Sequence, residues 1–209
     1  MRRLHAPCRA GWQLRSASPL AEDANLTVPA NTSVPVGNVA AAGNASELSV
    51  RFALPPVACR FGVRVLLQPG QPVGVELYVE YQPPAAANQS LHRVTVGSAP
   101  CGGAATHAAP WRSPQTSWPP QPFPTDTLAL LPSDRSIELR VFVDAAAATV
   151  ESFWMDGRVT LTTVAPAGDA TRGAMELFSD TAGVLVLEAV AWGMGDIWVP
   201  PEALMGGAA

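Results

Sequence analysis

Two carboxylates, Asp144 and Glu151, come closest to a catalytic pair by type and spacing in this chain. Hydrolysis of a glycosidic bond with retention of configuration needs two carboxyl groups roughly 5 Å apart, one as nucleophile and one as proton donor. Asp144 ends one predicted strand and Glu151 begins the next, so a short turn could bring them together. The same positions suit a structural role, in which they cap turn amides or pair with Arg140 or Arg158. We expect that structural role, and we assign no catalytic residue.

The remaining chemically active side chains show no arrangement that binds a metal or cofactor. The three histidines are scattered, and no Cys-x-x-Cys spacing or Cys/His cluster occurs. We therefore expect neither a metal nor a cofactor. Three cysteines cannot all pair within one chain. A disulfide between Cys59 and Cys101 is possible, and buried free thiols at these positions are the alternative. The histidines and the third cysteine are His5, His92, His107 and Cys8.

Charge and hydropathy argue against two classes of partner. The net charge is −4, no lysine occurs, and the body of the chain has no basic run that could neutralise phosphates. The longest apolar run, 184–192, contains Glu188 and is only as long as a strand, whereas a membrane-spanning helix needs about 20 residues. We expect no nucleic-acid partner and no membrane partner.

Four Asn-x-Ser/Thr triplets are candidate glycosylation sites, which act only if the chain enters a secretory compartment. They favour a secreted, vacuolar or cell-wall origin and hence a glycoprotein. The N-terminus lacks the apolar core of a signal peptide, so we expect a truncated chain, a fragment or an incomplete gene model. The four acceptors are Asn25, Asn31, Asn44 and Asn88.

Alternation of apolar and polar residues predicts many short β-strands, because period two is the pattern of a half-buried strand. Two of the runs end at Pro55-Pro56 and Pro83-Pro84, since proline cannot donate a ladder hydrogen bond. No segment of ten or more residues has a convincing helical period. The predicted strands are 48–54, 61–67, 73–81, 91–96, 137–143, 149–155, 158–164, 175–179, 184–192 and 196–199.

The dipeptide Asp156-Gly157 predicts a tight hairpin turn between two of these strands, because a type I′ turn needs positive φ at both central positions. The turn sets the register of the hairpin. It places three pairs on the core face: Trp154 opposite Val159, Ser152 opposite Leu161 and Val150 opposite Thr163. The residues on the other face are Glu151, Phe153, Thr160 and Thr162. The turn also explains Asp156 without a catalytic role.

Residues 97–126 are rich in Gly, Pro, Ala and Ser, and we predict a long loop there. Its two tryptophans, Trp111 and Trp118, have two interpretations. They anchor the loop on the sheet, which we favour, or they stack on a sugar ring.

Many short strands with turn signals between them predict an all-β fold, and uneven strand and loop lengths favour a two-layer antiparallel β-sandwich over a barrel. We expect a tail or linker remnant over 1–19, the sandwich over 20–199 and a second tail over 200–209.

The C-terminal third resembles the C-terminal sandwich of glycoside hydrolase family 32, the invertase or β-fructofuranosidase family. The resemblance rests on residues 137–144, 150–153 and 156–163, which follow that domain's leucine-arginine, valine-glutamate-x-phenylalanine and glycine-arginine signatures. Residues 175–179 and 191–198 are similar to its closing strands. The match weakens over 20–136, and 145–149 departs from the family's serine-containing link.

The resemblance implies a non-catalytic accessory domain of a glycosidase that acts in carbohydrate metabolism. In that family, catalysis belongs to a five-bladed propeller, and none of its three catalytic motifs occurs here. The implied role is to pack against and stabilise such a propeller or to support dimerisation. The alternative is a free-standing carbohydrate-binding module that uses Trp111 and Trp118.

Overall fold

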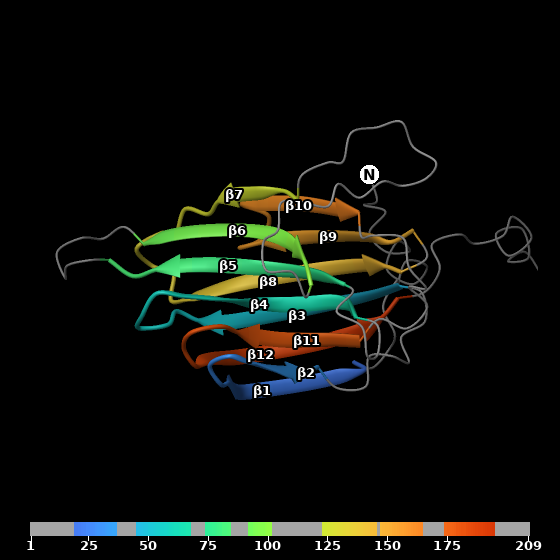
Figure 1. Cartoon of the computed structure of the whole chain (residues 1–209), viewed down its shortest axis with the longest axis horizontal. Helices are drawn as coiled ribbons and strands as arrows, with labels where there is room; N and C mark the ends of the chain where they lie inside the picture. Colours follow the sequence, from blue (N-terminus) through green and yellow to red (C-terminus); the bar gives the residue numbers. More distant parts are fainter. Residues whose placement is uncertain are drawn as a thin grey trace, which may run out of the picture.

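The computed structural model describes residues 19–36, 45–67, 74–84, 92–101, 123–145, 147–164 and 174–194. In this part of the chain every regular element is a β-strand, which confirms the predicted all-β class (Figure 1). The strands are β1 (Ala21–Val28), β2 (Thr32–Pro35), β3 (Ala45–Ala53), β4 (Cys59–Leu67), β5 (Val75–Gln82), β6 (Arg93–Pro100), β7 (Thr125–Thr127), β8 (Ser136–Asp144), β9 (Thr149–Trp154), β10 (Val159–Val164), β11 (Ala174–Ser179) and β12 (Val184–Gly193).

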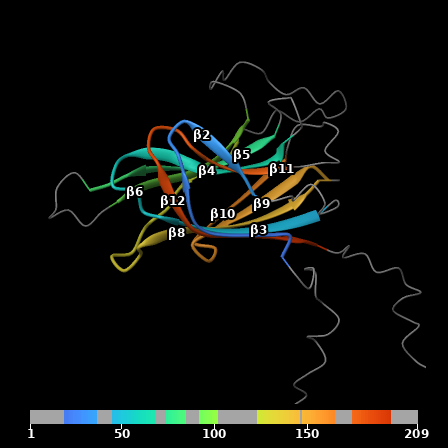
Figure 2. The same ribbon diagram turned by 90° about the horizontal axis from the view of Figure 1, so that it is seen from below.

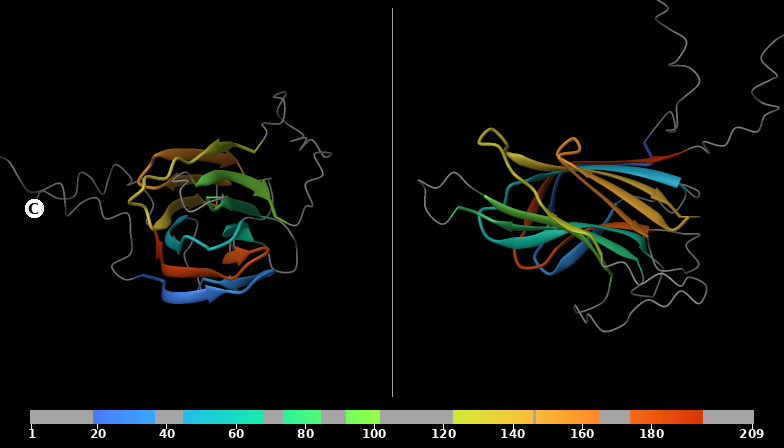
Figure 3. Two further views of the ribbon diagram at one scale, coloured as in Figure 1. Left: turned by 90° about the vertical axis from the view of Figure 1, so that its left-hand side faces the viewer. Right: turned by 90° about the horizontal axis from the view of Figure 1, so that it is seen from above.

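The strands form two antiparallel six-stranded sheets that lie face to face as a sandwich (Figure 2). The β3–β8 sheet has the order β1-β12-β3-β8-β9-β10, and the β4–β5 sheet has the order β2-β11-β4-β5-β6-β7. Neighbours distant in sequence, such as β3 and β12, therefore pair, and both ends of the described chain belong to the β3–β8 sheet. Viewed along the strands, β1 and β2 lie at one side of the sandwich and β7 and β10 at the other (Figure 3).

The core between the sheets is built from inward-facing aliphatic and aromatic side chains. Phe52 from one sheet meets Phe61 from the other edge to face, with ring centroids 5.1 Å apart. Trp154 is fully buried, and its indole N–H is a buried side-chain donor for which the structure shows no hydrogen-bond partner. None of the described residues forms a helix that could cross a bilayer.

The β9–β10 hairpin confirms the predicted register. Trp154 pairs with Val159, Ser152 with Leu161 and Val150 with Thr163, and all six side chains are buried on the core face. Glu151, Phe153, Thr160 and Thr162 lie on the other face, as expected.

Three strands were not predicted from the sequence: β1, β2 and β7. In β1 the alternation is broken at Asn25, which adopts φ +55°, and β2 and β7 are four and three residues long. The predicted loop 97–126 is also too long at both ends, since β6 continues to Pro100 and β7 begins at Thr125. The predicted strand 196–199 lies outside the described residues.

Candidate functional site

The carboxylates Asp144 and Glu151 lie farther apart than the retaining pair considered in the sequence. They lie on the outer face as diagonal neighbours, because Asp144 pairs with Thr149 and Glu151 with Phe142. Diagonal positions in such a ladder are about 7–8 Å apart, and both side chains are exposed to water. Asp144 Oδ1 accepts a hydrogen bond of 2.9 Å from the backbone N–H of Ala147, which is the expected turn cap.

The two arginines that we expected as partners of this pair are bound elsewhere. The Nε of Arg140 lies 2.6 Å from Oε1 of Glu47 on β3, and the Nη1 of Arg158 lies 2.6 Å from Oδ2 of Asp134. The hydrogen bond from Arg158 lowers the pKa of the Asp134 carboxyl below its usual range. Asp134 Oδ2 also accepts from the backbone N–H of Leu131, so this carboxylate ties the hairpin turn to the loop before β8.

Asp156 takes the turn role that was predicted for it. Asp156 and Gly157 have φ +56° and +86°, and the backbone N–H of Arg158 donates to the carbonyl of Met155 at 3.3 Å, as in a type I′ turn. Met155 also has positive φ, so regular pairing stops at Trp154 rather than at the predicted Met155.

Cys59 and Cys101 are both buried free thiols, so the disulfide that we left open does not form in this structure. Burial raises the pKa of Cys59 to about 11, with a further contribution from the charge of Asp180. Burial likewise raises the pKa of Cys101 to about 12. Both side chains are uncharged thiols at neutral pH, which does not suit a nucleophile or a metal ligand.

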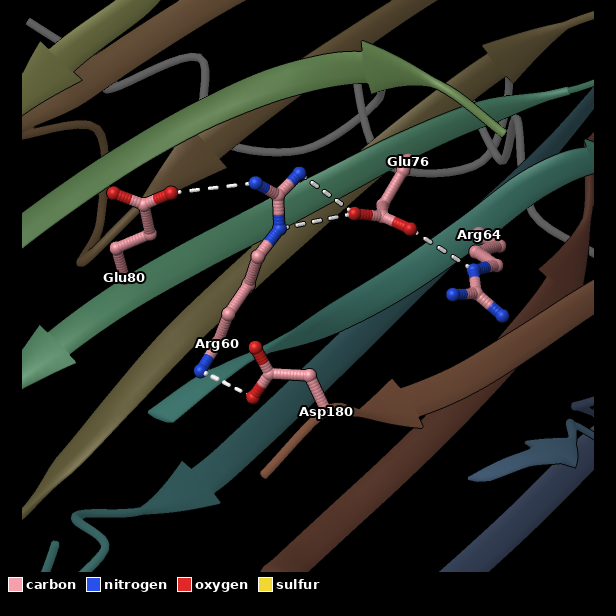
Figure 4. Close-up of polar contacts among 5 residues, drawn as sticks. All are labelled: Arg60, Arg64, Glu76, Glu80 and Asp180. Carbon is pink, nitrogen blue, oxygen red and sulfur yellow. Dashed lines mark hydrogen bonds and ion pairs between the residues drawn. The ribbon is translucent and has the colours of Figure 1, made fainter. Parts of the chain in front are cut away.

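A chain of ion pairs crosses the outer face of the β4–β5 sheet (Figure 4). The guanidinium of Arg60 lies between Glu76, at 2.7 Å, and Glu80, at 3.3 Å. The other carboxylate oxygen of Glu76 accepts from Nε of Arg64 at 3.0 Å. Asp180 Oδ1, in the turn after β11, accepts from the backbone N–H of Arg60 at 2.8 Å. Neighbouring strands thus hold these charges in a connected network.

Aromatic rings lie beneath the arginines of this network. The Arg60 guanidinium carbon is 3.6 Å from the centroid of the Tyr78 ring, and that of Arg64 is 4.5 Å from the centroid of Phe178. A Cβ atom at Gly97 would lie 2.7 Å from the Tyr78 ring, so glycine makes room for the tyrosine to lie across β6. Burial raises the pKa of the Tyr78 hydroxyl.

Sequence analysis missed this network. A signal was present, because Arg60 and Arg64, and likewise Glu76 and Glu80, are spaced so that each pair points to one face of its strand. Only the pairing of β4 with β5 brings the two sets together.

A groove of about 480 Å³ lies on the outer face of the β3–β8 sheet. Its Phe142 and Phe153 rings meet at 90° with centroids 5.7 Å apart, so they do not form the coplanar platform of a sugar-binding module. The guanidinium carbon of Arg140 lies 4.9 Å from the Phe142 centroid, and its partner Glu47 is 1% exposed. The groove is lined by Ser49, Val50, Arg51, Glu138, Leu139, Arg140, Phe142, Phe153, Asp156, Gly157, Glu188 and Trp192.

Four of the remaining predicted site residues lie outside the described residues: Trp111, Trp118, Asn44 and Asn88. Asn25 and Asn31 are exposed, on β1 and in the β1–β2 turn. Within the described ranges no group of three or more His, Cys, Asp or Glu side chains could hold a metal ion. The described arrangement can present two ordered outer surfaces, but it does not bring together an acid and a nucleophile.

The class that the fold defines is a two-layer β-sandwich with outer faces ordered by ion pairs. The chain belongs to the family described as Glycosyl hydrolases family 32 C terminal, which matches it over residues 13–193. A comparison with curated protein sequences gives no match.

Solved structures of a fructan exohydrolase, an exo-inulinase and a fructofuranosidase share this fold. The chain superposes with a TM-score of 0.68 at 14% identity on fructan 1-exohydrolase IIa from Cichorium intybus, covering 88% of this chain and 36% of that one. For exo-inulinase from Aspergillus awamori the TM-score is 0.58 at 14% identity, covering 88% and 31%. A fructofuranosidase from Schwanniomyces occidentalis complexed with fructosylnystose gives 0.54 at 12%, covering 84% and 33%. The chain therefore spans about a third of each enzyme.

Proposed function

We propose that this chain is the non-catalytic accessory sandwich of a family 32 glycoside hydrolase of the β-fructofuranosidase (invertase) type. Its role is to pack against a catalytic propeller and stabilise it. The observation that carries the proposal is the family match over residues 13–193, taken with the small share of each enzyme that the chain covers. Most of the chicory enzyme has no counterpart in this chain.

The state of the carboxylates supports the non-catalytic role. A glycosidase needs a proton donor with a raised pKa and a second carboxylate positioned across the sugar. Several carboxylates of the sandwich pair with an arginine or accept a hydrogen bond from a backbone N–H; they are Glu47, Glu76, Asp134 and Asp180. At Asp134 the hydrogen bond from Arg158 lowers the pKa of the carboxyl, which is opposite to what a general acid requires.

The groove on the β3–β8 sheet is the surface that we propose for the propeller. It is concave and combines half-buried aromatic rings with charged groups, as the buried centre and polar rim of a domain interface do. Arg51, paired with Glu188 at 3.4 Å, lies at this surface and is substantially exposed, so its charge is accessible to a partner. The perpendicular rings of the groove favour this role over that of a carbohydrate-binding module.

The test is to mix the chain with the propeller of the chicory enzyme, produced without its own sandwich, and to measure the propeller's melting temperature. We expect the temperature to rise, because a partner that binds only the folded state stabilises it. The chicory sandwich, added in the same way, is the positive control. A propeller stabilised by its own sandwich and unchanged by this chain would contradict the proposal.

A charge reversal locates the interface. Arg51→Glu changes the groove surface, whereas Arg93→Glu makes the same change at an exposed position on the other sheet. We expect the first variant to lose most of the stabilisation and the second to keep it. Equal effects of the two variants would show that the propeller does not sit on the groove.

The two described acceptor asparagines, Asn25 and Asn31, are proposed to carry N-glycans when the chain passes through a secretory pathway. Both are exposed and both adopt φ +55°. Asn25 is skipped in the register of β1 with β12, and Asn31 lies in the β1–β2 turn, so neither takes a regular ladder position. Intact mass after expression in a secretory host, compared with Thr27→Ala and Ser33→Ala variants, tests the assignment. A mass difference no larger than that of the amino-acid substitutions themselves would contradict it.

A further inference from the structure

Two leucines of β12, Leu185 and Leu187, lie outside the core of the sandwich. Leu185 is 39% exposed and Leu187 is half-buried, and neither is among the core residues between the sheets. A single exposed leucine is ordinary in a folded protein, but two at neighbouring positions of one strand form an apolar patch. We call these two residues the leucine patch.

The pairing of β1 with β12 places a candidate glycosylation site directly beside this patch. β1 is the outermost strand of the β3–β8 sheet and β12 is its neighbour (Figures 1 and 3). Thr27 pairs with Leu185, and the pairs on either side of Asn25 place Asn25 opposite Leu187. The acceptor triplet Asn25-Leu26-Thr27 therefore has one leucine of the patch opposite each of its ends.

Both strands are irregular at this level. Asn25 has φ +55°, and the register of β12 with β3 shifts between Val186 and Glu188, so Leu187 is an extra residue there. In a regular strand every second side chain points to the core, whereas an extra residue leaves that alternation and is aimed elsewhere. The two irregularities keep both the Asn25 amide and the Leu187 side chain at the surface.

The first sugar of an N-glycan has the chemistry to cover this patch. N-acetylglucosamine carries an acetyl methyl group and a face of ring C–H groups, while its hydroxyls stay in water at the rim of the ring. Contact of that face with the leucines removes apolar surface of both partners from water. A sugar linked to Asn25 is also held at a high effective concentration beside the patch.

We propose that the leucine patch binds the first N-acetylglucosamine of a glycan on Asn25. This inference rests on the glycosylation of Asn25, which is part of the proposed function. The sugar is fixed against β12 and shields the β1 edge, whose unpaired backbone groups are otherwise open to another strand. Neither leucine lines the groove of the β3–β8 sheet, so the site is separate from the surface proposed for the propeller.

A chain with a single acceptor triplet tests the contact. The substitutions Asn31→Gln, Asn44→Gln and Asn88→Gln leave Asn25 as the only acceptor. This chain is made in a secretory host, with its glycan trimmed enzymatically to one N-acetylglucosamine, and also in bacterial cytoplasm without sugar. Because the two forms share every amino acid, they differ only in the sugar, which intact mass verifies. We expect the form with the sugar to melt roughly 2–4 °C higher, the effect of burying about one methylene group in a domain of this size.

Two threonine substitutions show whether the leucine patch causes this stabilisation. Leu185→Thr removes the exposed leucine of the patch, and Val164→Thr makes a similar change at a 71% exposed position of β10, at the other edge of the same sheet. Both side chains are exposed, so both variants should fold, which the melting temperatures of their sugar-free forms check. We expect Leu185→Thr to lose most of the sugar's stabilisation and Val164→Thr to keep it. The difference separates the contact from any effect of the sugar on the unfolded chain.

Nuclear magnetic resonance locates the sugar directly. We expect nuclear Overhauser contacts between the acetyl methyl group of the sugar and the methyl groups of Leu185 and Leu187. A sugar that extends into water would give no such contacts.

The outcomes separate this inference from the glycosylation on which it rests. A chain that leaves the secretory host without a sugar on Asn25 would refute both. A glycosylated chain that melts at the same temperature as the sugar-free form would overturn the contact alone and leave the glycosylation standing. Full stabilisation retained by Leu185→Thr, or the absence of contacts to the leucine methyl groups, would likewise place the sugar elsewhere.

Discussion

Gly62, in the centre of β4, should be the glycine that the fold tolerates least when replaced by alanine. Its neighbours across the sheet are Tyr78 on β5 and Phe178 on β11. A Cβ atom at this position would lie 2.0 Å from the carbonyl oxygen of Leu77 and 3.0 Å from the Cα of Tyr78. Both contacts are to backbone in a paired strand, so no flexible side chain can move aside.

The type of contact sets the size of the expected loss in unfolding free energy. Overpacking that forces backbone shifts costs about 1–3 kcal/mol and occasionally more, and a contact of this length to a ladder carbonyl belongs at the upper end. We expect Gly62→Ala to lower the free energy of unfolding by about 3 kcal/mol. In a domain of this size each 1 kcal/mol shifts the melting temperature by about 2–4 °C, so the expected loss is roughly 6–12 °C.

Alanine substitutions at two other glycines separate steric overlap from backbone strain as causes of destabilisation. Gly157 has φ +86° and no atom within 4 Å of an added Cβ, so Gly157→Ala tests backbone strain alone, at about 1–2 kcal/mol. A Cβ at the exposed Gly183 would lie 3.7 Å from the nearest atom, an ordinary contact, and Gly183→Ala should change stability by less than about 0.5 kcal/mol. Urea unfolding of the three variants measures the order. Gly62→Ala as stable as Gly157→Ala would refute the reasoning.

Three further predictions concern charge and ionisation. The pKa of Asp134 is lowered in the folded state. The stability that Asp134 contributes is therefore present above the ordinary carboxyl pKa of about 3.9 and disappears as the pH falls through the pKa of the folded state. The urea midpoints of the wild type and Asp134→Asn should differ at pH 7 and converge at pH 2. The pKa values of Cys59 and Cys101 are raised to about 11 and 12. The free energy of unfolding should therefore fall as the pH rises above the ordinary thiol pKa of about 8.5. A Cys59→Ala, Cys101→Ala double variant should lose less stability over the same alkaline range. Arg60→Ala removes two ion pairs and the contact with the Tyr78 ring and should cost about 1–2 kcal/mol, against less than about 0.5 kcal/mol for Arg93→Ala in the same thermal assay.

Local sequence signals predicted most of the sandwich because its strands alternate cleanly. The Asp156-Gly157 turn set the hairpin register, and its six pairs follow from that turn alone. β1 could not be found in this way, because Asn25 interrupts the alternation with a positive φ that the neighbouring sequence does not predict.

The contacts that order the two outer faces could not be predicted, because they join distant strands. Arg140 is 93 positions from Glu47, and only the pairing of β3 with β8 brings them together. Asp180 reaches the backbone of Arg60 across 120 positions through the pairing of β4 with β11. A single sequence gives strand boundaries and faces, whereas the order of strands within each sheet decides which charges meet.

Fructose release by the purified chain tests the central claim most directly. The chain is incubated with sucrose, inulin and levan, and the chicory enzyme under the same conditions shows that the assay works. We predict no fructose from the chain alone, because Asp144 caps a turn and Glu47 and Asp134 pair with arginines rather than forming an acid and a nucleophile. Turnover by the chain that Asp144→Ala or Glu151→Ala abolishes would contradict the accessory role and identify the chain as an enzyme.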